Sequence, residues 1–213
     1  MVIVLLGPPG AGKGTQAPIL AGRLGLPILA SGDLLRAVAR SGTALGREVE
    51  AIMTSGALVP DDTTVSIFLD RLAEPDAARG AILDGFPRTA AQAAALDAAL
   101  ADRGSKVDAA ILVDVPADEL VARMADRVVC RADPTHVYNL RTKPPRRAGV
   151  CDLDGADLYR RADDEPETVR ARLAKQLAPL AEVVGHYRGR GVLRSVDGRQ
   201  PIAAVTEQVL AAL

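Results

Sequence analysis

Aromatic side chains are scarce in this sequence, which has no tryptophan, two phenylalanines and three tyrosines among 213 residues. The hydrophobic core must therefore be built from leucine, valine, isoleucine and alanine. Proteins that bind single-stranded nucleic acid stack bases on aromatic rings, so this scarcity argues against that class. The formal net charge of −1 provides no broad positive field for DNA or for an anionic membrane. Small molecules are the partners that this composition favours.

Cysteines and long apolar runs are scarce too. Cys130 and Cys151 are the two cysteines of the chain, too few for the disulfide framework of a secreted protein. No segment reaches the roughly 18 uninterrupted apolar residues of a membrane-spanning helix. The apolar run at residues 2–6 is too short for the core of a signal peptide. We therefore expect a cytoplasmic protein that does not associate with membranes.

Apolar segments of strand length alternate with segments of helical pattern. The strand-like segments are residues 2–6, 27–30, 81–83, 109–115 and 192–196. The helical patterns cover residues 13–24, 61–73, 89–101, 117–127 and 166–187. Short apolar strands joined by helical crossovers are typical of a parallel sheet that is covered on both faces. The sequence therefore predicts an α/β fold with a doubly wound parallel sheet of about five strands flanked by helices.

Two segments interrupt this alternation. Residues 33–60 have the pattern of short helices that end in the sequence SGALVP. Residues 129–159 are rich in proline, glycine, arginine and aspartate. Because a structureless loop of that length is uncommon within a compact domain, we expect the second segment to form a small folded lid.

A glycine-rich loop follows the first predicted strand. Residues 7–13, GPPGAGK, match the pattern G-x-x-x-x-G-K between a strand and a helix. Glycines let backbone N–H groups converge on an anion, the helix that follows presents its positive end, and the Lys13 ammonium reaches the terminal phosphates. Gly14 stands where serine or threonine usually follows the lysine, and Thr15 comes next. The loop predicts a polyphosphate site, and the alternative is a glycine- and proline-rich turn with an incidental lysine.

Five motifs occur in order along most of the chain. They are GPPGAGKGTQA at residues 7–17, SGDLLR at 31–36, DGFPRTAAQ at 84–92, RADDEPETVRARL at 161–173 and VDG at 196–198. With these motifs the chain resembles the adenylate kinases of the nucleoside monophosphate kinase family, in their long-lid form. The resemblance implies a P-loop NTPase-type fold and reversible Mg²⁺-dependent transfer of the terminal phosphoryl group of ATP to AMP, which gives two ADP. It also implies a monomer with a core at residues 1–29, 60–127 and 161–213, an AMP-binding flap at 30–59 and a lid at 128–160.

The resemblance also implies roles for individual residues. Catalytic roles are implied for Lys13, Asp84, Arg88, Arg123, Arg161 and Arg172, with Asp84 holding Mg²⁺ through water. ATP contacts are implied for Gly10, Ala11, Gly12, Lys13, Gly14, Thr15, Arg123, Arg127, Val137, Tyr138 and Gln200. AMP contacts are implied for Ser31, Arg36, Ala57, Leu58, Val59, Gly85, Phe86, Pro87, Arg88, Gln92, Arg161 and Arg172. Such a set suits phosphoryl transfer, which depends on positioning and charge neutralisation more than on a protein nucleophile.

Three other functions remain open at this point. Ser31 and Gln92 resemble adenylate kinases, whereas the related UMP/CMP kinases tend to carry alanine and asparagine there, so a pyrimidine kinase is the first alternative. A P-loop switch or ATPase that signals to a protein partner is the second, but it has no need of the motifs at 31–36 and 84–92. A zinc-ribbon nucleic-acid module is the third, and it leaves the glycine-rich loop unexplained.

Both cysteines fall within the predicted lid. Cys-x-x-Cys pairs at these places form a structural zinc site in many long-lid adenylate kinases, and here an aspartate replaces the second cysteine of each pair. The implied zinc ligands are Cys130, Asp133, Cys151 and Asp154, because zinc accepts carboxylate oxygen as well as thiolate in a tetrahedral site. Three alternatives remain: a hydrogen-bonded polar cluster without metal, a disulfide, and His136 in place of Asp133 as the ligand.

Overall fold

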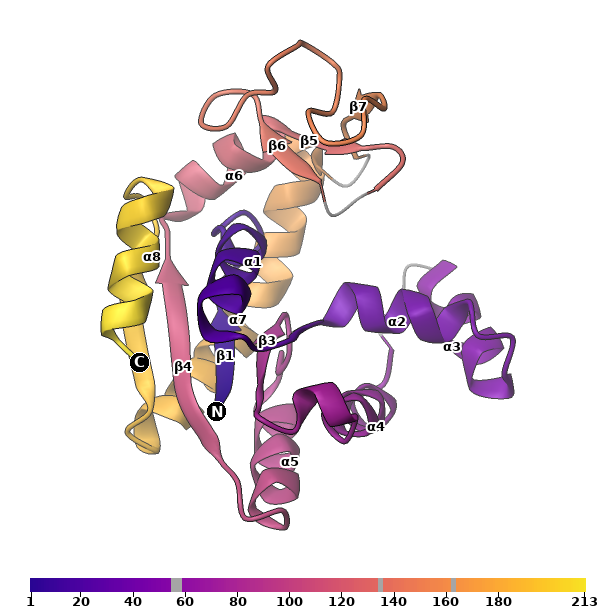
Figure 1. Ribbon diagram of the computed structural model, residues 1–213, viewed down its shortest axis with the longest axis vertical. Helices are drawn as coiled ribbons and strands as arrows, with labels where there is room; N and C mark the ends of the chain where they lie inside the picture. The colour runs from indigo at the N-terminus through magenta and orange to yellow at the C-terminus, as the bar shows by residue number, and fades with distance from the viewer. Residues whose placement is uncertain (55–58, 134–135, 162–163) are drawn as a thin grey trace.

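The computed structural model describes residues 1–54, 59–133, 136–161 and 164–213. Its centre is a sheet of five strands in the order β2-β3-β1-β4-β8, and every neighbouring pair is parallel (Figure 1). The strands are β1 (Val2–Leu6), β2 (Ile28–Ala30), β3 (Ala81–Asp84), β4 (Val107–Asp114) and β8 (Leu193–Asp197). Each lies where the sequence predicts it, to within about two residues at either end. The predicted doubly wound α/β fold is confirmed.

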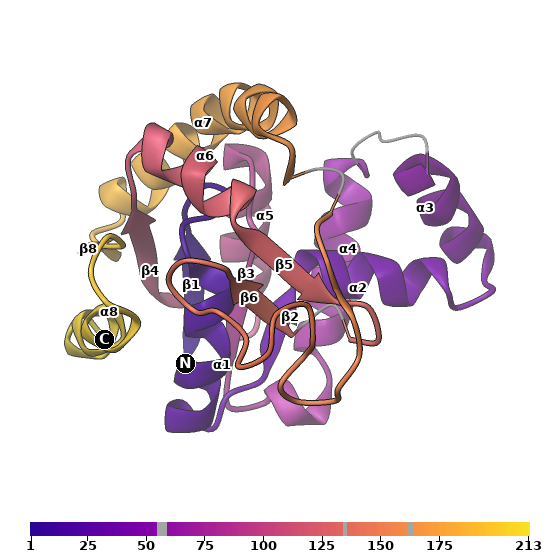
Figure 2. The same ribbon diagram turned by 90° about the horizontal axis from the view of Figure 1, so that it is seen from above.

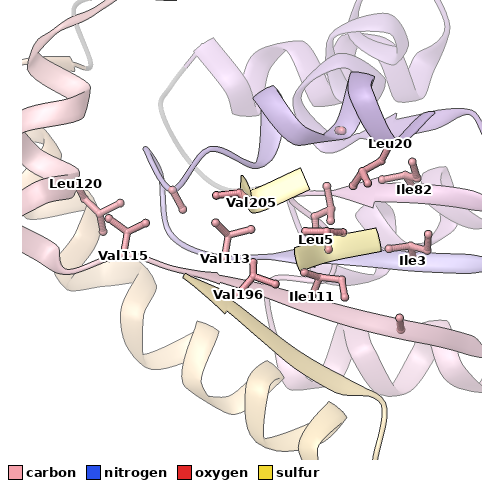
Figure 3. Close-up of a cluster of buried hydrophobic side chains, with 14 of the residues drawn as sticks. Ile3, Leu5, Leu20, Ile82, Ile111, Val113, Val115, Leu120, Val196 and Val205 are labelled. Carbon is pink, nitrogen blue, oxygen red and sulfur yellow. The ribbon is translucent and has the colours of Figure 1, made fainter. Parts of the chain in front are cut away.

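Helices cover both faces of the sheet. They are α1 (Lys13–Leu24), α4 (Asp61–Leu72), α5 (Ala90–Ala101), α6 (Ala117–Ala125), α7 (Pro166–Gly189) and α8 (Ile202–Ala211), with a short 3₁₀ helix, η1 (Pro75–Ala77), after α4. Helix α8 was not among the predicted helices. Successive strand residues point to opposite faces, so Ile3 and Leu5 pack with Leu20 of α1 and Val205 of α8 (Figure 3). Their neighbours in β1 pack on the other face with α4, α5 and the second half of α7.

Helices α2 (Ser31–Ala39) and α3 (Ala44–Thr54) form an extension to one side of the sheet (Figure 1). The two helices contact each other, and a separate apolar cluster of Val49, Val59 and Ile67 lies beneath them. The predicted short helices are thus confirmed. Ala57 and Leu58, for which AMP contacts were predicted, lie outside the described residues.

The predicted lid contains a small antiparallel sheet. Its strands are β5 (Arg127–Cys130), β6 (Val137–Asn139) and β7 (Leu158–Tyr159), in the order β6-β5-β7. Val128, Cys130, Tyr138 and Cys151 form its apolar cluster. This sheet lies beyond the carboxyl ends of the central strands (Figures 1 and 2). The prediction of a folded segment is confirmed, although its strands were not predicted.

Among the described residues, no helix combines the length and the apolar character that crossing a membrane requires.

Candidate functional site

The register of the central sheet aligns three loops. Leu5 of β1 and Ala30 of β2 both pair with Asp84, the last residue of β3. The glycine-rich loop after β1, the loop after β3 and the start of α2 therefore leave the sheet at one edge. Ligands of open α/β sheets bind in the crevice outside the carboxyl ends of the strands. These loops are the ones in which the sequence places its motifs.

The glycine-rich loop adopts a backbone that requires glycine. Gly7, Gly10 and Gly12 have φ angles of 144°, 85° and 103°, a region that other residues rarely adopt. A Cβ on Gly7 would also lie 2.9 Å from the carbonyl oxygen of Val113. Gly12 is the N-cap of α1 and brings no side chain to the helix start. The loop and the start of α1 thus have the backbone geometry that the predicted anion site requires.

Lys13 lies within this loop. Its Nζ donates hydrogen bonds to the carbonyl oxygens of Gly7, at 2.7 Å, and Pro8, at 3.1 Å. Burial lowers the pKa of the Lys13 ammonium; the charge of Asp84 opposes this effect, and the positive charges of Arg88 and Arg127 add to it. Four of the predicted site residues are thus within electrostatic reach of one another. A bound polyphosphate would offset the repulsion among the three cations.

Asp84 ends β3 beside the start of α1. A Cβ on Gly14 would lie 3.8 Å from Asp84 Oδ2. Burial raises the pKa of the Asp84 carboxyl, Lys13 and Arg88 oppose that rise, and Asp33 adds to it. A carboxylate oxygen next to a phosphate loop is the type of donor that Mg²⁺ prefers.

A second group of predicted residues is joined by hydrogen bonds. Arg88 Nη2 donates to Ser31 Oγ at 2.8 Å, and Arg88 Nε donates to the carbonyl oxygen of Gly85 at 2.7 Å. The backbone N–H of Arg88 donates to Gln92 Oε1 at 2.7 Å. Gly85 has a φ of 75°, and a Cβ there would lie 2.7 Å from Ser31 Oγ. The tertiary structure therefore brings together four residues for which AMP contacts were predicted.

Other residues of the predicted AMP set have different surroundings. The Phe86 ring is fully buried and stacks on Phe68 with 4.0 Å between ring centroids, so its side chain belongs to the core. Pro87 is buried as well, and the peptide bond that joins the two residues is cis. Val59 lies in the apolar cluster under the flap helices. The exposed Arg36 is paired with Asp33 at 2.6 Å.

The arginines at the lid side are held by carboxylates. Arg123 donates to Glu119 Oε1 and, through Nη2, to the carbonyl oxygen of Gly198 at 2.9 Å. Arg127 forms a two-point ion pair with Asp164, which is fully buried. Sequence patterns did not predict Glu119 and Asp164 as partners of these arginines, although Asp164 lies within the motif at residues 161–173. Arg161 is described, whereas the side chain of Arg172 lies outside the described residues.

Three predicted ATP contacts lie in the lid and in the loop after β8. Val137 and Tyr138 are in β6, and the Tyr138 hydroxyl accepts a hydrogen bond from the backbone N–H of Asp152 at 2.7 Å. Gln200 Nε2 donates to Asp197 Oδ2 at 3.2 Å. Within the part of the chain that the structure describes, no hydrogen bond connects these residues with the glycine-rich loop.

The lid holds a cluster of side chains that differs from the predicted zinc ligands by one member. Single ligand atoms of Cys130, His136, Cys151 and Asp154 all lie within 4.8 Å of one another. Asp133 is not among them: its Oδ2 lies 3.4 Å from His136 Nε2, on the side away from the cluster. The His136 imidazole belongs to the cluster, and the His136 backbone N–H donates to the Asp133 carbonyl oxygen at 3.0 Å. The four side chains that converge are thus those of the alternative in which His136 takes the place of Asp133.

Hydrogen bonds connect this lid cluster. Both oxygens of Asp154 lie 3.2 Å from Cys130 Sγ, and its Oδ2 lies 2.9 Å from His136 Nδ1. Bonds from the Ala156 N–H and from the thiols of Cys151 and Cys130 lower the pKa of Asp154 to about 2. Both cysteines are free, so no disulfide is formed. Two sulfur atoms, one imidazole nitrogen and one carboxylate oxygen are a donor set that zinc accepts.

Comparison with known proteins points to one family. The family model described as adenylate kinase matches residues 5–192. An adenylate kinase of Streptomyces griseus is 47% identical over 213 residues, which is 100% of this chain and 97% of the relative. Adenylate kinases of Moorella thermoacetica and Symbiobacterium thermophilum are 47% and 46% identical, over 96% and 98% of this chain and 94% and 96% of their own lengths. Since the match extends over the glycine-rich loop, the flap and the lid alike, this chain belongs to the adenylate kinase family.

Proposed function

We propose that the protein catalyses the reversible, Mg²⁺-dependent transfer of the terminal phosphoryl group of ATP to AMP, which gives two ADP. Family membership supports this reaction. The observation that carries it is the position of Arg88, which bonds to Ser31 and Gln92 and also acts electrostatically on Lys13. One guanidinium thus connects the glycine-rich loop with the predicted acceptor site. Transfer between two nucleotides requires such a connection, whereas a nucleotide switch does not.

On the donor side, the loop at residues 10–15 would hold the phosphates of ATP. Its amides and the positive end of α1 would bind the phosphate oxygens, and the Lys13 ammonium would exchange its two carbonyl partners for the terminal phosphates. Asp84 and the water molecules that it orients would hold Mg²⁺. The ion, when bound with ATP, would neutralise charge on the donor phosphates.

On the acceptor side, Arg88 has a planar fork of donors that suits two oxygens of one phosphate. Ser31 and Gln92 would contact AMP beside it, with Arg36, the backbone of residues 57–59 and the backbone of residues 85–87 completing the site. The four arginines at positions 123, 127, 161 and 172 would add positive charge around the transferred group. No protein nucleophile is required for this reaction.

We further propose that the chain divides into a core of residues 1–29, 60–127 and 161–213, an AMP-binding flap at 30–59 and a lid at 128–160. Closure of the flap and the lid over the two nucleotides would exclude water, so that AMP rather than solvent accepts the phosphoryl group. We also propose that the protein is a cytoplasmic monomer that binds ATP, AMP and ADP, and neither nucleic acid nor membranes. The absence of a broad positive charge supports this last point.

A coupled assay of ADP formation tests the reaction. The assay supplies ATP and Mg²⁺ with AMP, UMP, CMP or no acceptor. We expect turnover with AMP to exceed turnover with either pyrimidine nucleotide and with water alone. A preference for UMP or CMP would identify a pyrimidine kinase instead, and slow hydrolysis that no acceptor accelerates would identify a nucleotide switch.

Replacement of Asp84 with asparagine is expected to lower kcat without lowering the melting temperature at neutral pH. Because folding raises the pKa of this carboxyl, its ionised form is less favourable in the folded protein than in the unfolded chain. The carboxylate therefore reduces stability at pH values above its folded pKa, and asparagine removes this cost. The cost vanishes below the ordinary carboxyl pKa of 3.8, where the carboxyl is protonated in both states.

Enzyme assays and thermal melts at several pH values test this prediction, with the exposed Asp102→Asn as the matched control. The variant should melt at or above the wild-type temperature at pH 7, and the difference should shrink as the pH falls toward 4. A clear loss of stability at pH 7 would contradict the sign of the effect. Turnover equal to the wild type would contradict the proposed role in holding Mg²⁺.

For the lid we propose a structural zinc site formed by Cys130, His136, Cys151 and Asp154. The cluster geometry supports it, and so does the Asp133 carboxylate, because a ligating imidazole commonly has a carboxylate at its other nitrogen. The backbone N–H of Asp133 also points to Cys130 Sγ at 3.5 Å, which suits a thiolate. Bound zinc would stabilise the lid fold rather than take part in phosphoryl transfer.

Metal analysis after exhaustive dialysis tests the zinc site. We expect about one zinc per chain in the wild type, and we expect less than about 0.1 zinc per chain in Cys151→Ser and in His136→Ala. Asp133→Asn should retain the metal, because its carboxylate lies behind the imidazole. Loss of zinc in Asp133→Asn with retention in His136→Ala would restore Asp133 as the ligand. A zinc-free wild type would leave the hydrogen-bonded polar cluster as the correct description.

A further inference from the structure

Asp61 connects the starts of two helices at the proposed acceptor site. It is the first residue of α4, and it comes two residues after the end of the proposed flap at residues 30–59. Its Oδ2 accepts a hydrogen bond from Thr89 Oγ1 at 2.7 Å, and its Oδ1 accepts one from Gln92 Nε2 at 2.7 Å. Thr89 is the N-cap of α5, and its Oγ1 accepts from the Gln92 backbone N–H at 3.1 Å. Gln92 is only 4% exposed. Its Nε2 donates to Asp61, its backbone N–H donates to Thr89, and its Oε1 accepts from the backbone N–H of Arg88.

These contacts determine which way the Gln92 amide is oriented. A carboxylate only accepts hydrogen bonds, so the NH₂ end of the amide must face Asp61. A backbone N–H only donates, so the oxygen end must face Arg88, from which it accepts at 2.7 Å. In the reversed amide an oxygen would face the Asp61 carboxylate and an NH₂ group would face the Arg88 N–H. Both contacts would then be repulsive, and both groups would lose a buried partner.

One hydrogen and one oxygen lone pair of the Gln92 amide remain for a ligand. A side-chain amide has two hydrogens and two lone pairs. Asp61 and the Arg88 N–H take one of each, and the described residues show no other hydrogen bond to this amide. The Asp61 contact sets which end of the amide offers the remaining donor and which end offers the remaining acceptor.

That order distinguishes two classes of purine. The edge of a 6-aminopurine presents a donor at the 6-amino group next to an acceptor at N1, and a 6-oxopurine presents an acceptor at O6 next to a donor at N1. An amide can pair with either edge, but the two edges require opposite orientations of the amide. A fixed amide is therefore selective, whereas an amide that is free to reverse is not.

We propose that Asp61 is a positioning residue that sets the base specificity of the acceptor site. It holds the Gln92 amide in one orientation, so that the site selects a 6-aminopurine monophosphate over a 6-oxopurine monophosphate. This inference rests on the proposed function, in which Gln92 contacts the base of AMP. Asp61 itself touches no reacting atom.

The variant Asp61→Asn tests the proposal, because asparagine has the same shape but offers an NH₂ group. With its oxygen still accepting from Thr89, the new amide turns its NH₂ toward Gln92 and opposes the orientation that the Arg88 N–H favours, so the Gln92 amide is no longer fixed in one orientation. We expect the ratio of kcat/KM for AMP to kcat/KM for IMP to fall about tenfold or more, whereas KM for ATP stays at its wild-type value. Asp62→Asn, at the exposed neighbouring residue, is the matched control and should keep the wild-type ratio.

The outcomes separate the inference from the function on which it rests. A wild type that does not phosphorylate AMP would overturn the proposed function. A wild type that prefers AMP, together with an Asp61→Asn variant whose AMP-to-IMP ratio stays within about twofold of it, would overturn only this inference. A merely structural role would lower stability and reduce both values of kcat/KM equally, which also counts against the proposal.

A measurement on the wild type covers the case in which Asp61→Asn fails to fold. Neutron diffraction from deuterium-exchanged crystals of the ligand-free enzyme would locate the deuterium atoms of the Gln92 side-chain amide. We expect its ND₂ group to face Asp61 and its oxygen to face the Arg88 backbone N–H. A reversed amide, or one that occupies both orientations, would overturn the proposal.

Discussion

Replacement of Lys13 with alanine is expected to lower kcat by about 10²–10³-fold or more, because it removes the ammonium that stabilises the charge of the transferred group. Burial and the neighbouring Arg88 and Arg127 make this ammonium less favourable in the ligand-free protein, and the charge of Asp84 opposes their effect. The site is therefore suited to an anionic ligand. The Lys13 charge should be more favourable when the anionic transition state is bound than when the site is empty. Steady-state rates of ADP formation at saturating ATP and AMP measure the effect.

The same substitution should leave the fold intact. Lys13 is half-buried, and the two carbonyl oxygens that it contacts belong to the loop at the open edge of the sheet, where water replaces the lost donor. Lys106→Ala, at an exposed lysine before β4, is the matched control and should keep wild-type turnover. A Lys13→Ala enzyme that is folded and retains near-normal turnover would contradict the role of the glycine-rich loop.

Replacement of Arg88 with alanine is expected to have the second large effect, with kcat lowered by at least about 10²-fold. Arg88 bonds to Ser31, Gly85 and Gln92 and also acts electrostatically on Lys13. Its loss would remove positive charge from the point at which the two nucleotides meet. Because the side chain is exposed at the mouth of the site, the melting temperature should change little.

Two further variants sharpen the Arg88 experiment. Arg88→Lys keeps the charge but not the planar fork, so it should restore only a small part of the lost kcat. Arg103→Ala, at an exposed arginine after α5, is the matched control and should behave as the wild type. If Arg88→Lys were fully active, charge alone would explain the contribution of Arg88, and the proposed two-point contact with phosphate would be wrong.

The local pattern of the sequence was enough to predict the central sheet and the phosphate loop. The five strands are short apolar runs between helical patterns. Because both faces of the sheet are buried, most strand residues are apolar, and such runs can be recognised from the sequence alone. The loop at residues 7–13 was equally clear, because its backbone needs glycine at positions of positive φ. Helix α8 and the strands of the lid were missed. The lid strands are two to four residues long, too short to show a period.

Contacts between distant residues could not be predicted in the same way. Spacing along the chain suggested Asp133 as the partner of Cys130, but His136 lies in the cluster and the Asp133 carboxylate lies at the other nitrogen of its imidazole. The pairing of Arg127 with the buried Asp164 likewise joins residues 37 positions apart. Neither contact has a local signature, because each depends on how separate loops pack.

The sequence by itself determined the α/β architecture, the glycine-rich loop before α1 and the family to which the chain belongs, because these depend on backbone requirements and apolar periods that local residues express directly. Only the tertiary structure decided which lid side chains converge and how the Gln92 amide is oriented. The orientation depends on Asp61, 31 positions earlier in the chain, and on its contacts with the start of α5. Hydrogen-bond direction is a property of paired groups in space, and it becomes defined when folding brings a pure acceptor and a pure donor to the two ends of one amide.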